Sequence, residues 1–181
     1  MVKIPYVTIF LLTLLIIVTY FGGYIYDVSP YLIDKNSILL PPSFSHPFGT
    51  DRLGRDILAR VIEGGKVSLN IGLASSLITS LVGLIAGISA GFFQKSVDKI
   101  LVVVIDLFLT FPTFFLLLAL VSYINASILV LIFVISITGW MSMARMIRSE
   151  SFKIASKPYI KILKLAKVSN AKIIFKYFAP L

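Results

Sequence analysis

Charged side chains gather in one short stretch of this sequence, and their types are those used in acid–base chemistry. Asp51, Arg52, Arg55 and Asp56 lie within six residues of one another, and the single histidine, His46, stands just before them. General acid–base catalysis needs such groups beside a nucleophile or a bound metal. The stretch offers neither partner, so we favour a salt-bridged connecting segment over a catalytic site.

Other catalytic and metal-binding patterns are missing. The sequence has no cysteine, and one histidine is too few for a histidine-rich metal site. The phosphate-binding pattern GxxxxGK[ST], the nucleophile elbow GxSxG and the zinc pattern HExxH do not occur. We therefore expect no enzyme and no metal site. If ATP drives this system, another chain must bind it.

Asp106 is the one charge in an apolar stretch of 45 residues, 100–144. Ionisable groups are costly in lipid and usually mark a functional position. Asp106 follows Lys99 by seven residues, or about 10 Å of helix, so packing and the lining of a solute path both remain open. Pro112 removes one backbone hydrogen bond, and a kink there suits a path-lining helix, although kinks are also ordinary in membrane helices.

The elements that position these residues are membrane helices. Hydrophobic residues make up 58% of the 181, and only 14% are charged, whereas soluble domains have about 45–50% and about 25%. Spans are predicted at 4–26, 67–94, about 100–122 and about 126–146, since about 20 apolar residues cross a bilayer. A secretory signal is the alternative for the first. The fold class is thus an all-α, polytopic membrane protein with about four transmembrane helices.

Positive charge predicts the orientation. Nine lysines and arginines but one acidic residue follow position 144, while 27–66 holds five of each sign. The positive-inside rule then places the N-terminus, the 95–99 link and the tail in the cytoplasm of a multi-pass plasma-membrane protein. The net charge of +9 is explained by orientation rather than by nucleic-acid binding. The predicted parts are 1–26, an extracytoplasmic segment 27–66, a three-helix core 67–146 and a cytoplasmic tail 147–181.

Small residues mark one face of the second span. Gly83, Gly87 and Gly91 recur every four residues, which lets another helix approach closely. Packing within one subunit and a seam between subunits are both open.

The tail is predicted to form two short amphipathic helices joined by a turn. Pro158 opens the first, with Ile162, Leu163 and Ala166 as its apolar side, and Ser169 caps the second, which ends at Pro180. Lying on anionic lipid, anchoring the chain and docking a partner are the alternatives.

The run HPFGTDRLGRD at 46–56, followed by GGKVSL at 64–69, resembles the second permease subunit of the dipeptide/oligopeptide/nickel ABC transporters. This resemblance implies a type I ABC importer fold and a peptide or nickel substrate. It also implies four partners besides the bilayer: a homologous permease, two cytoplasmic ATPase subunits that bind the ATP, and an extracytoplasmic solute-binding protein. The residues of this external motif are His46, Gly49, Thr50, Asp51, Gly54, Arg55 and Asp56.

The family's cytoplasmic EAA loop, a coupling helix seated in the ATPase subunit, corresponds to Tyr159 through Pro180. The sequence departs from that pattern in having Lys161 for glutamate, Ile162 and Leu163 for two alanines, and Lys167 for glycine, while Ser169 fits it. Family members also continue for two more spans. The alternative is therefore a truncated or degenerate permease that inserts but does not transport.

Overall fold

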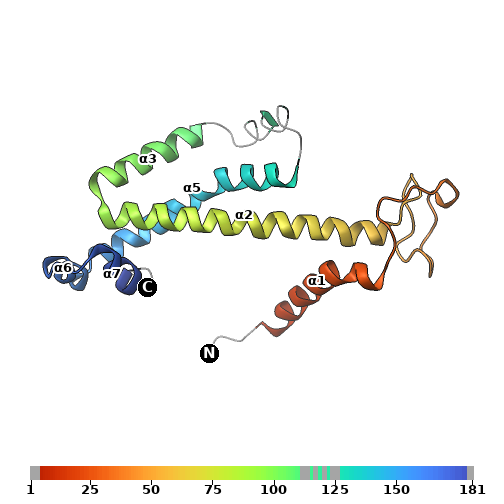
Figure 1. Cartoon of the computed structure of the whole chain (residues 1–181), viewed down its shortest axis with the longest axis horizontal. Helices are drawn as coiled ribbons and strands as arrows, with labels where there is room; N and C mark the ends of the chain where they lie inside the picture. Colours follow the sequence, from red (N-terminus) through yellow and green to blue (C-terminus); the bar gives the residue numbers. More distant parts are fainter. Residues whose placement is uncertain (1–4, 111–114, 116–117, 120–121, 123–126, 179–181) are drawn as a thin grey trace. The chain divides into compact units, whose positions relative to one another are not determined.

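The structure, a computed structural model, describes residues 5–178 apart from 111–114, 116–117, 120–121 and 123–126 (Figure 1). Its elements are α1 (Tyr6–Ile25), the 3-10 helix η1 (Lys35–Ser37), α2 (Ile57–Phe93), α3 (Lys95–Thr110), α5 (Ile128–Ala155), α6 (Pro158–Leu165), α7 (Asn170–Ile173) and η2 (Ile174–Phe178). The described residues contain no strand, which confirms the all-α class. The chain forms two compact units, Met1–Asn70 and Ile71–Leu181.

Among the described residues, α1, α2 and α5 are long and apolar enough to cross a membrane. With 20 residues, α1 is about 30 Å long, the thickness of the hydrocarbon layer. Thr19 is its only buried residue, and the rest of its surface is largely isoleucine, leucine, valine and aromatic side chains. A surface of this kind is stable in lipid rather than in water, so the chain is a multi-pass membrane protein.

The helix that contains the second predicted span, α2, begins ten residues before that span. It runs without a break from Ile57 to Phe93, so the last ten residues before the predicted span are helical as well. The Asp56 carboxylate accepts a hydrogen bond from the Ala59 N–H at 2.8 Å, which satisfies a free donor in the first turn. No proline interrupts the following 37 residues.

Gly64 and Gly65, near the start of α2, reduce its helix propensity, but Gly65 serves packing in the first unit. A Cβ atom on Gly65 would lie 3.0 Å from the Thr19 side chain of α1. The same pair of helices is joined where the Tyr20 hydroxyl donates to the Asn70 side chain at 2.7 Å. Close approach of α1 therefore requires a small residue at position 65.

The third and fourth predicted spans differ in how fully they are described. α3 covers the first part of the third span, but Pro112 and most of the residues up to 126 lie outside the described part. α5 begins where the Ser127 side chain accepts from the Val130 N–H at 3.2 Å, and it continues nine residues past the predicted end at 146. Arg148, which the sequence placed in the tail, thus lies on the same helix as Arg145.

The core of the second unit forms where α2, α3 and α5 meet. Its buried residues are Ala90, Leu101, Ile105, Met141 and Ala144. The glycine face of α2 lies directly against α5: a Cβ on Gly83 would stand 2.7 Å from the Cβ of Met143, and one on Gly87 would stand 2.8 Å from the Ala144 carbonyl oxygen. Gly91 is similarly confined by Ser151. The three glycines therefore pack two helices of the same chain.

A methyl group on this face should destabilise the second unit. We expect Gly87→Ala to lower the free energy of unfolding by about 1–3 kcal/mol, because the added carbon meets backbone atoms that cannot rotate away. Gly72→Ala is the matched control, since nothing lies within 4 Å of that position, and it should be neutral or gain up to about 1 kcal/mol in helix propensity. Thermal unfolding in detergent, followed by Trp140 fluorescence, measures both. Equal midpoints for the two variants would contradict the packing.

Candidate functional site: a helix pair at the ends of α2 and α5

The tail folds as a helix pair, α6 and α7, beside the C-terminal ends of α2 and α5 (Figure 1). Pro158 occupies the first helical position of α6, where its missing N–H costs nothing. Ile160 and Ile173 are fully buried against Phe92 of α2 and Ala155 of α5. The pair is therefore anchored on two membrane helices at once.

The buried side of α6 differs from the prediction. Leu163 packs on the apolar cluster as predicted, but Ile162 and Ala166 are exposed. The inward positions are Ile160 and Leu163, three residues apart and therefore on one side of the helix. Ile160 was not predicted because it stands two residues after the opening proline, before the residues chosen for the apolar side.

Lys164 makes a contact with Phe92 that was not predicted from the sequence. Its Nζ donates to the backbone carbonyl of Phe92 at 3.1 Å and lies 4.2 Å from the centre of that phenyl ring. A cation is favourable at this place, because the carbonyls at a helix C-terminus carry partial negative charge and the ring face attracts cations. Lys164 thus fastens α6 to the last turn of α2.

The turn after α6 is a Schellman motif with lysine in the place of glycine. The Lys167 N–H donates to the Lys164 carbonyl at 3.1 Å, and the Val168 N–H donates to the Leu163 carbonyl at 3.2 Å. Lys167 takes φ +54°, the left-handed conformation that glycine adopts without strain. The turn has the shape that glycine favours, although the residue there is lysine.

Ser169 stands at the N-cap of α7, but its side chain makes no capping hydrogen bond. Only its carbonyl takes part, accepting from the Ile173 N–H at 3.0 Å. The side-chain cap predicted for this serine is therefore wrong. Pro180, the predicted end of the second helix, lies outside the described residues.

The side of α6 opposite the cluster is apolar. Ile162 is 64% exposed and Leu165 82%, and Lys161 is exposed on the same side of the helix. We call these three residues the tail face. Of the seven coupling-loop residues predicted from sequence, Lys161 and Ile162 lie on this face. Leu163 packs against the buried cluster, and Tyr159 is 37% exposed.

Two ion pairs join α3 to α5 within the second unit. Arg148 grips Asp98 with both Nε and Nη2, the second contact at 2.8 Å. This hydrogen bond holds the pKa of Asp98 below its ordinary value despite partial burial of the carboxylate. Further along α3, Asp106 accepts from Arg145 Nη2 at 2.8 Å. The structure therefore supplies a partner for the one charge predicted inside a span.

The external motif predicted from sequence forms a hydrogen-bonded network in the first unit. The Asp56 side chain is 2% exposed, and its Oδ2 accepts from the Tyr26 hydroxyl at 2.7 Å and lies 2.9 Å from His46 Nδ1. Burial acts to raise the pKa of Asp56, but these contacts and the Ala59 N–H outweigh it and lower that pKa. Burial and the Asp56 contact raise the pKa of Tyr26 to about 12. Tyr26 was not predicted as a member of this network.

The remaining motif residues shape the same segment. Asp51 pairs with Arg55 at 2.8 Å and also with Arg60, and hydrogen bonds hold its pKa well below the ordinary value although burial opposes them. Buried Thr50 donates to the Ser37 carbonyl. Gly49 and Gly54 have φ near +73° and +74° and face backbone carbonyls where a Cβ would stand. The charges thus brace the segment, as the salt-bridge interpretation predicts.

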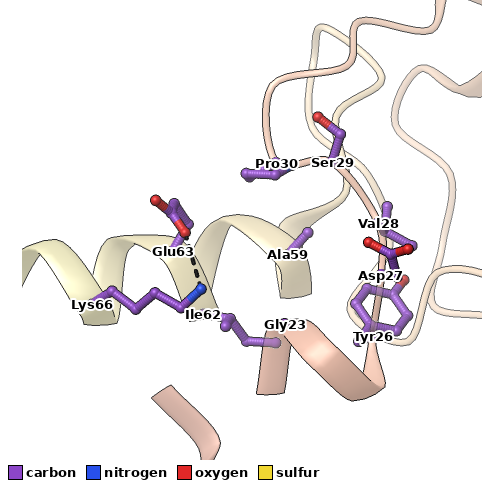
Figure 2. Close-up of a pocket in the computed structure, with 10 residues that line it drawn as sticks. All are labelled: Gly23, Tyr26, Asp27, Val28, Ser29, Pro30, Ala59, Ile62, Glu63 and Lys66. Carbon is purple, nitrogen blue, oxygen red and sulfur yellow. Dashed lines mark ion pairs between the residues drawn. The ribbon is translucent and has the colours of Figure 1, made fainter. Parts of the chain in front are cut away.

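A pocket of about 350 Å³ lies beside this network, between the end of α1 and the start of α2 (Figure 2). Its lining includes Gly23, Asp27 and Ala59, and Lys66 Nζ lies 3.5 Å from Glu63 Oε2 at its edge. The described residues contain no group of histidine or acidic side chains suited to a metal. No catalytic arrangement appears there.

Residues 83–181 match the family described as the binding-protein-dependent transport system inner membrane component. The chain belongs to this family. The matched region contains all three glycines of the glycine face, both α3–α5 ion pairs and the tail helix pair. Transport permeases of this kind are not enzymes, in line with the sequence.

Curated relatives make the resemblance specific. The dipeptide transport system permease DppC of Bacillus subtilis is 30% identical over 181 residues, covering 98% of this chain and 56% of that protein. The oligopeptide permease OppC of the same organism is 31% identical over 77% of this chain and 46% of its own length. The nickel permease NikC of Escherichia coli is 33% identical over 83% of this chain and 54% of its own length. The chain spans about half the length of these relatives.

The strained turn after α6 gives one prediction. We expect Lys167→Gly to stabilise the helix pair by about 1 kcal/mol, because glycine removes the cost of the left-handed conformation. The same substitution at Lys161, inside α6, should destabilise it by about 1 kcal/mol. Hydrogen exchange of the amides in α6 and α7 measures the difference. Equal effects at the two lysines would show that the turn is unstrained.

The buried network gives a pH prediction. Asp51 and Asp56 have lowered pKa values, so they stabilise the fold above a pH of about 4, and this contribution is lost as the pH falls further. Tyr26 has a raised pKa, so its contribution is present below a pH of about 10 and is lost as the pH rises toward 12.

Thermal midpoints between pH 3 and 11 measure this dependence. Asp56→Asn should flatten the acid side and cost about 1–3 kcal/mol at neutral pH, and Tyr26→Phe should flatten the alkaline side. Asp27→Asn is the control, because that side chain is exposed. Parallel acid limbs for native chain and Asp56→Asn would contradict the assignment.

Proposed function

We propose that this chain is a permease subunit of an ATP-driven importer and that the tail face docks on an ATPase subunit. The carrying observation is the anchored helix pair. One side of α6 is fixed to α2 and α5, and the other side presents Ile162 and Leu165. Large apolar side chains left exposed together, beside a lysine, are typical of a surface that a partner covers.

The face also suits a particular partner chemistry. Lys161 lies beside Leu165 on the exposed side of α6, and exposed Lys167 follows in the turn, so a complementary groove would combine an apolar floor with acidic edges. Such charges guide association and fix the register of docking. Because Lys161 stands where the family has glutamate, the ATPase that fits this chain carries acidic rather than basic residues at that point.

The remaining assignments follow from this role. The tail and the N-terminus lie in the cytoplasm, in keeping with the basic charge of the tail, and the segment before α2 faces the other side. The partners are a homologous permease, two ATPase subunits that bind the ATP, and an extracytoplasmic solute-binding protein. The substrate class is di- or oligopeptides, with nickel as the alternative, because the relatives are named for these solutes.

A second candidate function is a membrane protein that inserts without transporting. Lys161 and Lys167, which replace the family's glutamate and glycine, favour it. Raised ATPase binding after Lys161→Glu with Lys167→Gly would support this candidate, because it would mark the native tail as an impaired coupling loop.

Docking is tested by purification from native membranes. We expect the tagged chain to bring down ATPase subunits, and Leu165→Glu to reduce their recovery at least tenfold, because it buries a charge in an apolar contact. Phe44→Glu is the control, since Phe44 is fully exposed in the segment before α2. Unchanged recovery with Leu165→Glu, or no ATPase with the native chain, would overturn the proposal.

A further inference from the structure

The exposed side of α5 carries a polar stripe that membrane packing does not explain. Thr138, Ser142, Arg145 and Ser149 follow one another at intervals of four, three and four residues, which places them on one face of a helix. Ser142, Arg145 and Ser149 are exposed, and Thr138 is partly so. The neighbouring strip is apolar, with Ile128, Ile135 and Met146.

The charges on this face do not suit lipid. The side chains of Arg145 and Asp106 are 52% and 59% exposed in this chain. An unscreened charged side chain costs free energy in the hydrocarbon layer, and the cost grows with its depth. A serine or threonine in a helix can satisfy itself on its own backbone, as Thr138 does on the Val134 carbonyl at 2.9 Å. The charges of a guanidinium and a carboxylate are not compensated in this way, so these groups need water or a polar surface.

The two arginines of α5 differ in how they are engaged. Arg148 uses Nε and Nη2 on both oxygens of Asp98, and that carboxylate is only 17% exposed. Arg145 donates through Nη2 alone to one oxygen of Asp106. Among the described residues, Nε and Nη1 of Arg145 have no acceptor, and guanidinium donors match a carboxylate in pairs. Arg148 is thus a closed structural clamp, and Arg145 is open.

We infer that the polar stripe lines a water-filled passage and that Arg145 receives the carboxylate of a solute there, with Asp106 balancing its charge between solutes. The inference rests on the proposed permease function, in which peptides supply the carboxylate through their C-termini. Asp106 holds one edge of the guanidinium, so a solute can bind the other edge without first breaking the ion pair. Arg145 is in this sense a specificity-determining residue rather than a structural one.

The native chain contains no cysteine, so single cysteines report on water directly. We expect Ser142→Cys and Ser149→Cys to react with charged methanethiosulfonates several-fold faster than Met146→Cys in sonicated native membranes, because thiolates form in water and not in lipid. Met146 is the matched control, since it lies one residue from Arg145 and is 69% exposed. Equal rates at the three positions would overturn the passage.

The charge of the reagent tests the anion site. The quantity measured at Ser142→Cys is the reaction rate of the negatively charged sulfonate reagent divided by that of the positively charged trimethylammonium reagent. We expect this ratio to rise when Asp106→Asn is added and to fall several-fold when Arg145→Gln is added instead. Arg145→Lys should restore the ratio, which separates a charge effect from a folding defect. The same ratio with and without Arg145→Gln would overturn the assignment of Arg145 as a carboxylate site.

These measurements are independent of ATPase recovery. If the native chain brings down no ATPase but the stripe is reactive and charge-selective, the importer proposal fails, and the water-filled anion site remains. If ATPase subunits are recovered but the stripe is unreactive, the importer stands and the site fails.

Discussion

The second unit depends on the distance between α2 and α5. Three glycines on one face of α2 bring its backbone within side-chain range of Met143, Ala144 and Ser151. In lipid there is little hydrophobic drive to bring two helices together, so contact depends on van der Waals fit, which small residues provide. Wherever a side chain replaced hydrogen at this seam, the helices would have to separate along their length.

Everything at the tail end of that unit follows from this contact. With α5 held against α2, Ala155 and Phe92 lie close enough to form one apolar floor for Ile160 and Ile173. Lys164 adds a polar contact beside this apolar cluster, because its Nζ donates to the Phe92 carbonyl. A force applied to α6 therefore reaches the ends of both membrane helices through packed atoms rather than through a loose connection. This is the property that a coupling element needs, because tightly packed groups pass on small displacements.

Much of this architecture could be predicted from residue patterns. Hydropathy located the helices now described as α1, α2 and α5, since about 20 uncharged residues admit few alternatives in a membrane protein. The glycine spacing identified a packing face but not its partner, because spacing within one helix carries no information about which helix lies opposite. The sequence did not predict where α2 starts, because the charged residues before position 67 mark the edge of an apolar span and not the end of a helix. The helix starts where the Asp56 side chain accepts from a free backbone N–H of the first turn.

The contacts that could not be predicted are those made by common residues over long separations. Lys164 looks like any lysine of a basic tail, and Arg145 and Arg148 look alike in sequence, three residues apart on one helix. They become different only because Asp98 and Asp106 lie at two levels of α3. A bidentate clamp and an open guanidinium are properties of the pair, so they appear only once both helices are placed.

The two lysines that depart from the family pattern have different physical consequences. Lys161 is exposed on the tail face, so its charge acts on whatever covers that face and has little effect on the fold of α6. Lys167 lies in the turn, where both Schellman hydrogen bonds form around it despite a left-handed backbone. The cost there is local strain of about 1–2 kcal/mol, which the packing of Leu163 and Val168 on the apolar cluster offsets. The tail thus keeps its shape with both lysines, and what they change is the charge that the tail presents on its surface.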